Sequence, residues 1–229
     1  MARVTYECDG GVATITMDDG KVNALSPDMQ AEINAALDKA EADQAVVILT
    51  GNQKALSAGF DLSIITTPGP ESVAMLRGGF DLSCRLLSFP TPVVIAASGH
   101  AIAMGFFLLL SGDYRIGVDK PVKLMANEVQ IGMTLPWAAI EITRHRLTKN
   151  AYQRMLDLAE PIAVEEAVAA GVLDAVVPED QLMTTAREVA TRFASTLNMD
   201  AHRGTKARVR ADMLKAIRAA NDAEFPAAT

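Results

Sequence analysis

Hydrophobic positions along the chain follow two patterns: short continuous apolar runs, and apolar residues that recur every three or four positions. The runs predict buried strands, and the recurring positions predict helices with one buried face. Strands are expected at 12–17, 45–51 and 92–99. Helices are expected at 26–42, 75–89, 103–111 and 178–197. Because strands alternate with helices, we predict βαβ units and an α/β fold with a parallel sheet under helical cover.

The first of these helices carries the clearest local signals. Ser26 can cap its first turn, and Pro27 suits the position that follows. Met29, Ile33 and Leu37 recur every four residues and form one apolar face. Near the other end of the chain, a further apolar stripe predicts another helix. Its members are Val209, Met213 and Ile217.

The C-terminal helices can pack on the core or on a neighbouring subunit, and the pattern alone leaves both open. We divide the chain into an α/β core at 1–175 and a helical region at 176–229. The second region is a candidate for a lid or an oligomerisation surface.

Composition indicates a globular protein with a sizeable core. Of 229 residues, 50% are hydrophobic and 21% are charged. The formal net charge of −7 argues against a nucleic-acid partner. The longest apolar stretch, Ala101–Leu110, is much shorter than the roughly 20 residues of a membrane span. We therefore expect a soluble protein without a membrane partner.

Two cysteines, Cys8 and Cys84, lie far apart, and neither belongs to a CxxC or Cys/His cluster. We therefore expect no disulfide scaffold and no metal site. The N-terminus lacks the apolar segment of a signal peptide. Together with the cysteine usage, this indicates a cytoplasmic location.

Two glycine-bearing turns follow predicted buried strands, at Ala55–Leu62 and at Ser98–Phe106. Ligands of open α/β sheets bind at the carboxyl ends of strands, so both turns lie where a site is expected. Their free N–H groups can converge on a developing oxyanion. The alternative is that they are tight turns that merely connect core elements.

A serine hydrolase based on Ser98 and His100 is disfavoured, because residues so close in sequence seldom point toward each other. His145 and His202 are expected at the surface.

Glu128 is a lone carboxylate in an apolar segment. Its neighbours Val129, Ile131, Met133 and Leu135 are hydrophobic. Desolvation raises the pKa of a carboxyl group, and this is how a general base near neutrality is made. The alternative is a solvated glutamate at the start of a helix, where negative charge is favourable.

Taken together, these segments resemble the enoyl-CoA hydratase/isomerase (crotonase) family. The resemblance runs in order through KVNAL, VILTG, LSAGFDL, PVVIAASGHAIAMG, NEVQIG and VEEAVAAGVLDAVVP, roughly three quarters of the chain. It implies the ClpP/crotonase fold, a spiral of βαβ repeats followed by C-terminal helices. It also implies an acyl-CoA thioester as substrate, no separate cofactor, and a homotrimer or a dimer of trimers.

The resemblance also assigns residues by position. It implies backbone oxyanion donors at Phe60 and Met104 and an acid/base at Glu128. It implies further contacts with CoA or substrate, at Lys21, Ala24, Ala58, Asp61, Leu62 and Phe107.

The chain departs from the family's hydratases at Phe107. Those enzymes hold a water molecule between two glutamates, and Phe107 occupies the position of the first one. Isomerisation of a double bond needs one base, so a single glutamate in a dry pocket favours an isomerase. The candidates to exclude water, which as bulky apolar residues can equally be plain core, are Phe106, Phe107, Leu135 and Trp137.

Three functions remain open: an enoyl-CoA isomerase, a hydratase or other crotonase-type enzyme with a second acid/base group, and a non-catalytic acyl-CoA-binding protein. Glu141 is either a displaced second carboxylate or a partner for Arg144 or His145. Lys206 and Arg210 either reach CoA phosphates or belong to a solvated helix face paired with nearby acids.

Overall fold

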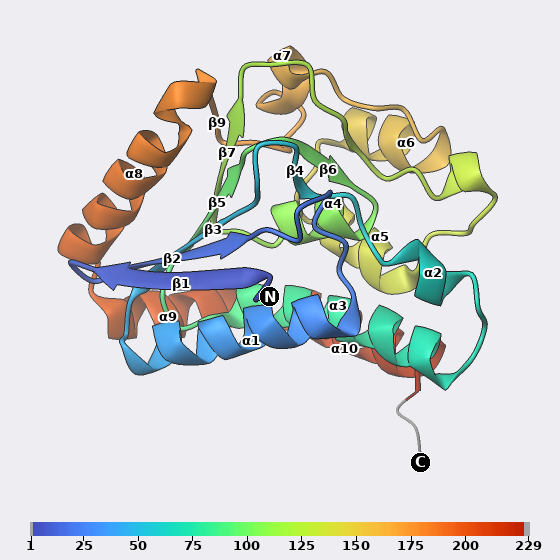
Figure 1. Ribbon diagram of the computed structural model, residues 1–229, viewed down its shortest axis with the longest axis horizontal. Coiled ribbons are helices and arrows are strands. Elements are labelled where there is room, and N and C mark those ends of the chain that lie inside the picture. Colours follow the sequence, from blue (N-terminus) through green and yellow to red (C-terminus); the bar gives the residue numbers. More distant parts are fainter. Residues whose placement is uncertain (1, 227–229) are drawn as a thin grey trace.

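The computed structural model describes residues 2–226, which form two β-sheets surrounded by helices (Figure 1). The larger sheet has six strands in the order β1-β2-β3-β5-β7-β9, and the smaller sheet has the order β4-β6-β8. The strands are β1 (Val4–Asp9), β2 (Val12–Met17), β3 (Val46–Thr50), β4 (Ala55–Ser57), β5 (Val93–Ala97), β6 (His100–Ile102), β7 (Tyr114–Val118), β8 (Leu124–Met125) and β9 (Ala175–Val177).

Helices occupy the connections and most of the last quarter of the chain. The α-helices are α1 (Pro27–Ala42), α2 (Leu62–Ile65), α3 (Pro70–Ser88), α4 (Met104–Leu110), α5 (Trp137–Arg144), α6 (Lys149–Asp157), α7 (Val164–Ala167), α8 (Leu182–Thr196), α9 (Met199–Val209) and α10 (Ala211–Glu224). The 3-10 turns are η1 (Val129–Ile131) and η2 (Glu179–Gln181).

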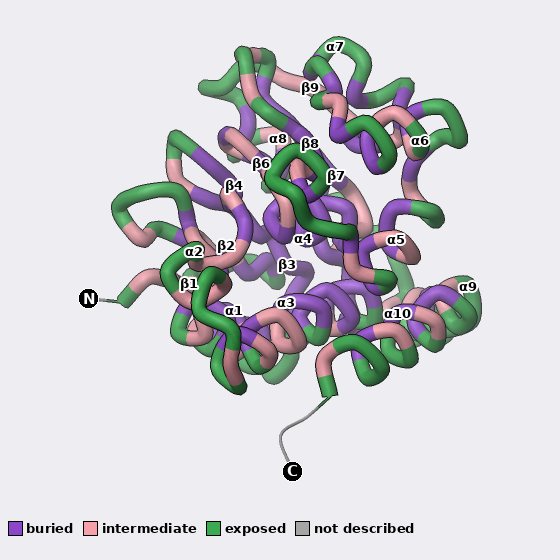
Figure 2. Tube along the Cα trace, turned by 90° about the vertical axis from the view of Figure 1, so that its right-hand side faces the viewer, coloured by how far each residue is buried: buried purple, intermediate pink, exposed green. Residues whose placement is uncertain are grey.

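The larger sheet is buried on both faces, which explains the continuous apolar runs of its inner strands. In β3, Val46 and Ile48 belong to the core cluster that includes α8, whereas Val47 and Leu49 belong to the cluster of α1 and α3. This is the alternation expected of a strand between two helical layers. Figure 1 shows α8 on one side of the sheet and α1 and α3 on the other. In Figure 2 the trace of β3 and α4 is buried, and the exposed trace lies in outer loops and helices.

The predicted parallel sheet is confirmed: β2, β3, β5, β7 and β9 pair in parallel, and only β1 among the described strands of that sheet runs antiparallel. The first predicted helix is also confirmed, and the Ser26 side chain accepts a hydrogen bond from Met29 N. The helix expected at 75–89 begins earlier, at Pro70, because Gly69 and Ser72 form its N-terminal cap.

One predicted apolar stripe is wrong. Met213 and Ile217 are buried, but Val209 is 78% exposed. The helix breaks at Arg210, which ends α9 and precedes α10, so Val209 lies in a different helix from the other two.

The C-terminal helices pack on the chain's own core. Leu182, Ala186 and Val189 of α8 lie against the larger sheet, which is one of the two arrangements that the pattern left open. Helix α10 packs against α3 and α5. Among the described residues, no helix has the length and hydropathy needed to cross a membrane.

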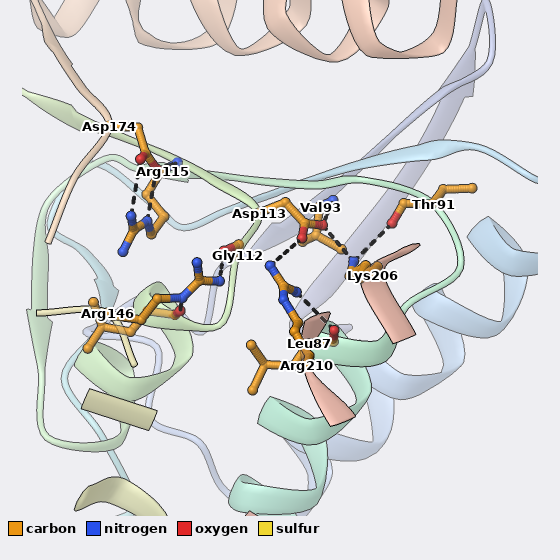
Figure 3. Close-up of polar contacts among 11 residues, drawn as sticks. Leu87, Thr91, Val93, Gly112, Asp113, Arg115, Arg146, Asp174, Lys206 and Arg210 are labelled. Carbon is orange, nitrogen blue, oxygen red and sulfur yellow. Dashed lines mark hydrogen bonds and ion pairs between the residues drawn. The ribbon is translucent and has the colours of Figure 1, made fainter. Parts of the chain in front are cut away.

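Helix α9 is fastened to the core by a buried ion cluster, shown in Figure 3. Lys206 Nζ lies 2.6 Å from Asp113 Oδ2, and an Arg210 guanidinium nitrogen lies 2.7 Å from Asp113 Oδ1. The prediction that Lys206 and Arg210 pair with a nearby acid is confirmed. The prediction that they lie on a solvated helix face is wrong, because the Lys206 side chain is only 6% exposed.

Candidate active site

The smaller sheet brings the predicted site residues to one edge. Its strands β4, β6 and β8 are parallel, so their carboxyl ends point the same way. Phe60 follows the end of β4 by three residues, Met104 follows β6 by two, and Glu128 follows β8 by three. Sites in α/β proteins form at this edge. The sequence pattern missed these three short strands, which lie within or beside the glycine-bearing turns.

The two glycine-bearing turns pack backbone against backbone. Gly59 has a φ of +99°, and a Cβ there would lie 3.0 Å from Ala103 Cβ and 3.5 Å from Met104 N. A Cβ at Gly105 would lie 2.1 Å from Ser57 O, so only glycine permits α4 to approach β4 this closely. The segments that carry Phe60 and Met104 are therefore neighbours in space.

Both candidate donors are unpaired. Within residues 2–226, no oxygen accepts a hydrogen bond from the backbone N–H of Phe60 or of Met104. Ala103, directly before Met104, has a φ of 50°, a conformation that costs free energy for a residue with a side chain. Two free N–H groups on adjacent turns are what the oxyanion hole implied by the resemblance requires.

Asn23 holds the neighbouring segment in place, a role that the sequence did not reveal. Its buried amide donates to the carbonyls of Met17, Ala55 and Leu56. Two residues further on, Leu25 N donates to Gly59 O at 2.8 Å, which joins this segment to the first glycine-bearing turn. Asn23 has a φ of 54°, which asparagine adopts more readily than most residues, so the KVNAL motif is built around it.

The residues assigned to CoA contacts lie along this joined segment. Lys21 and Leu62 are exposed, and Ala24 and Ala58 are half-buried. Asp61 caps α2 by accepting a hydrogen bond from Ser63 N. The adjoining hollow has a volume of about 250 Å³ and a largely acidic lining. It is formed by Arg3, Asp19, Ala24, Ser26, Pro27, Asp28, Asp61, Ile64 and Glu71.

Glu128 is buried and its carboxylate is unsatisfied. The residue is 6% exposed, and no described residue makes a hydrogen bond to its Oε2. Its backbone is fixed, because Glu128 O accepts from Ile131 N at 3.1 Å and from Met133 N at 2.9 Å. Burial raises the pKa of the Glu128 carboxyl from 4.5 to about 7. Such a group can take up and release a proton near neutral pH.

The predicted source of this desolvation is wrong in part. Val129, Ile131 and Met133 are 45%, 56% and 38% exposed, since the turn at η1 points them outward. Leu135 is buried, as expected. Burial of Glu128 is therefore a consequence of the fold around β8 rather than of the apolar residues beside it in the sequence.

Phe107 is 1% exposed and belongs to an aromatic cluster. Its ring stacks on Phe80 with centroids 6.3 Å apart, and Phe80 also contacts Phe60 and Phe225. Phe106 is equally buried, whereas Trp137 is 59% exposed and its backbone N–H donates to Glu224. Phe107 thus fills its position with packed hydrocarbon.

Other candidate groups are accounted for by ordinary contacts. Glu141 pairs with Arg144 at 3.3 Å, one of the two interpretations of its sequence position. Ser98 donates to Asn52 O, and His100 Nδ1 accepts from Lys123 N, so these two do not form a hydrolase pair. His145 is exposed as predicted.

His202, however, is half-buried, contrary to expectation, with Nε2 enclosed and burial lowering its pKa. Within the described part of the chain, His, Cys, Asp and Glu side chains form no cluster able to hold a metal ion.

Comparison with known proteins defines the class. A family model described as enoyl-CoA hydratase/isomerase matches residues 7–225. The chain therefore belongs to the enoyl-CoA hydratase/isomerase (crotonase) family, and it is an enzyme of the kind that acts on acyl-CoA thioesters.

Individual relatives carry two different names. An enoyl-CoA hydratase from Mycobacterium marinum is 49% identical, with a TM-score of 0.93 over 98% of this chain and 100% of that one. A protein from Mycobacterium tuberculosis, named an enoyl-CoA isomerase in one solved structure and a probable enoyl-CoA hydratase in another, is also 49% identical. Its TM-score is 0.93 over 97% of this chain and 99% of that one. The mitochondrial enoyl-CoA delta isomerase 1 of Mus musculus is 32% identical over 198 residues, 83% of this chain and 68% of that protein.

Proposed function

We propose that the protein is an enoyl-CoA isomerase that moves a double bond with one carboxylate, Glu128. The observation that carries this proposal is the combination of a buried, unpaired carboxylate with a pKa of about 7 and a packed phenylalanine, Phe107, where the family's hydratases have a second glutamate. Isomerisation needs a single base that gives back the proton it takes, whereas hydration also needs an activated water molecule.

In the proposed reaction, the ionised Glu128 removes a proton from C2 of a 3-enoyl thioester. The electron pair moves into a dienolate, whose negative oxygen accepts hydrogen bonds from the N–H groups of Phe60 and Met104. The protonated Glu128 then delivers the same proton to C4, which yields the 2-enoyl thioester with no net gain or loss of atoms. Free donors on rigid turns suit this task because they need no reorganisation when charge develops.

Binding of the CoA portion is assigned to the segment beside the oxyanion donors. Lys21 is an exposed cation of this segment and is assigned to a CoA phosphate; the other assigned contacts are Ala24, Ala58, Asp61 and Leu62. The homotrimer, or dimer of trimers, and the lid or oligomerisation role of residues 176–229 remain predictions that belong to the same proposal.

The Glu128→Gln variant tests the proposal, because glutamine keeps the shape of glutamate but cannot act as a base. We expect kcat for 3-enoyl-CoA to fall by about 10²–10⁴-fold while affinity for a saturated acyl-CoA is retained. Glu141→Gln is the matched control and should keep wild-type kcat. An unchanged rate in Glu128→Gln would remove this residue from the mechanism, and a loss in Glu141→Gln alone would favour a hydratase with a displaced carboxylate.

A further inference from the structure

Helix α3 contains two consecutive glycines, Gly78 and Gly79, in the middle of its 19 residues. A glycine in a helix interior is less favourable than alanine, so one that is packed tightly against other elements indicates a close approach that a side chain would prevent. Gly79 is buried against elements that are distant in sequence.

The neighbours of Gly79 are the side chains of the two proposed oxyanion donors. A Cβ at position 79 would lie 2.5 Å from both Cε1 and Cζ of the Phe60 ring, and 3.3 Å from Met104 Cγ. Real Cβ atoms do not approach other atoms to 2.5 Å, so any side chain here would push the Phe60 ring by about 1 Å.

The Phe60 ring is half-buried and is held on its inner side by an aromatic contact. It contacts Phe80 edge to face, with centroids 6.5 Å apart and an interplanar angle of 70°. Phe80 is 1% exposed and is itself stacked on Phe107 and on Phe225. An added methyl group would therefore press on the ring from the side of α3 and transmit its displacement to the turn that carries Phe60.

We propose that Gly79 is a positioning residue that sets the distance between the N–H groups of Phe60 and Met104. This inference rests on the proposed function, since it assumes that these two groups bind the thioester oxygen. Gly79 does not touch substrate; it acts through the two side chains that lie on it. Misplacement of catalytic groups by about 1 Å can cost roughly 10²-fold in rate.

The Gly79→Ala variant tests this inference. We expect kcat to fall about 10- to 100-fold, with affinity for a saturated acyl-CoA retained, because ground-state binding depends less on the oxyanion geometry. Gly204→Ala is the matched control: Gly204 lies within α9, and nothing lies within 4 Å of its Cβ position. That variant should keep wild-type kcat and gain about 2–4 °C in Tm, because alanine favours a helix more than glycine does.

A second variant separates positioning from a general packing defect. In a Phe60→Leu background the aromatic ring is absent while the backbone N–H remains, so Gly79→Ala should cause little further loss of kcat. The double variant also relieves the clash, which keeps the test valid if Gly79→Ala alone folds poorly. An equal loss of kcat with and without the ring would overturn the inference, as would wild-type kcat in Gly79→Ala.

A spectroscopic measurement distinguishes this inference from the proposed function. Acetoacetyl-CoA forms an enolate that absorbs in the near ultraviolet, and two aligned donors should increase that absorbance on binding. Gly79→Ala should bind acetoacetyl-CoA with a weaker enolate signal. Wild-type protein that shows the signal but does not isomerise 3-enoyl-CoA would refute the proposed function alone; an undiminished signal in Gly79→Ala would refute only the role of Gly79.

Discussion

At Glu128, the proposed function and the stability of the fold oppose each other. Its folded pKa of about 7 lies above the ordinary value of 4.5, so the folded chain holds on to a proton that the unfolded chain releases. Between these two pH values, stability therefore falls as pH rises, and above pH 7 the loss is complete. The shift corresponds to about 3 kcal/mol at 1.36 kcal/mol per unit. The same raised pKa that lowers stability is what would let Glu128 exchange a proton near neutral pH.

This argument predicts a pH-dependent gain in stability for Glu128→Gln. At pH 8 the free energy of unfolding of the variant should exceed that of wild type by up to about 3 kcal/mol, because the variant no longer buries a charge. At pH 4, where Glu128 is protonated in both states, the difference should nearly vanish. Urea unfolding at the two pH values measures it, with Glu141→Gln as a control. An equal effect at both pH values would contradict the raised pKa.

At the scale of elements, the attachment of α9 depends on buried charge. Asp113 accepts from Lys206, from Arg210 and from Val93 N (Figure 3). Nearby Arg146 pairs with no acid within residues 2–226 and donates instead to the carbonyls of Leu110 and Gly112. Burial lowers the pKa of Arg146 to about 9. Removing one acid from such a cluster leaves cations without compensation.

We therefore expect Asp113→Asn to reduce the free energy of unfolding by about 3 kcal/mol, since Lys206 and Arg210 would remain buried without a counter-charge. The matched control is Asp9→Asn, because the Asp9 side chain is 86% exposed in its pair with Arg187. That change should cost less than about 0.5 kcal/mol. Chemical denaturation measures both. Similar values for the two variants would show that the cluster contributes no more than a surface pair.

The same comparison of elements shows what the sequence could predict. Short strand-like runs located β2, β3 and β5, because strands covered by helices on both faces are largely apolar. The three- to four-residue spacing of apolar positions located α1 and α8, because each buries one face. Strands β4, β6 and β8 have two or three residues each, too short for any period to appear. The break at Arg210 was missed because no proline or glycine marks it. Tertiary packing alone determines such features.

The site residues follow a similar division. The resemblance to the crotonase family supplied Phe60, Met104 and Glu128, and the fold places all three just after parallel strands of one small sheet. Asn23 and Gly79 were missed, because their roles depend on contacts with segments far away in the chain. Isolated buried polar groups and mid-helix glycines are the signals that point to such residues.

At the scale of the whole molecule, the acidic surface opposes an anionic substrate. The net charge is −7, and the hollow beside Ala24 and Asp61 has four carboxylates in its lining against one cation, Arg3. Lys21, whose backbone N–H donates to Asp19 of that lining, therefore acts against its surroundings. Lys21→Met should raise KM for an acyl-CoA about 3- to 5-fold at low salt and leave kcat unchanged. The effect should shrink at high ionic strength. Steady-state kinetics with Lys149→Met as control measure it; equal KM values for the two variants would remove Lys21 from CoA binding.

The most direct test of the central claim is a product-resolved assay of the purified protein with 3-enoyl-CoA and 2-enoyl-CoA, read by mass spectrometry. The account predicts that the 3-enoyl ester is converted into the 2-enoyl ester with no change in mass, and that the 2-enoyl ester gains water slowly or not at all. Rapid addition of water to the 2-enoyl ester would contradict it, because one carboxylate, with Phe107 packed where the family's hydratases have a second glutamate, offers no other group to activate that water.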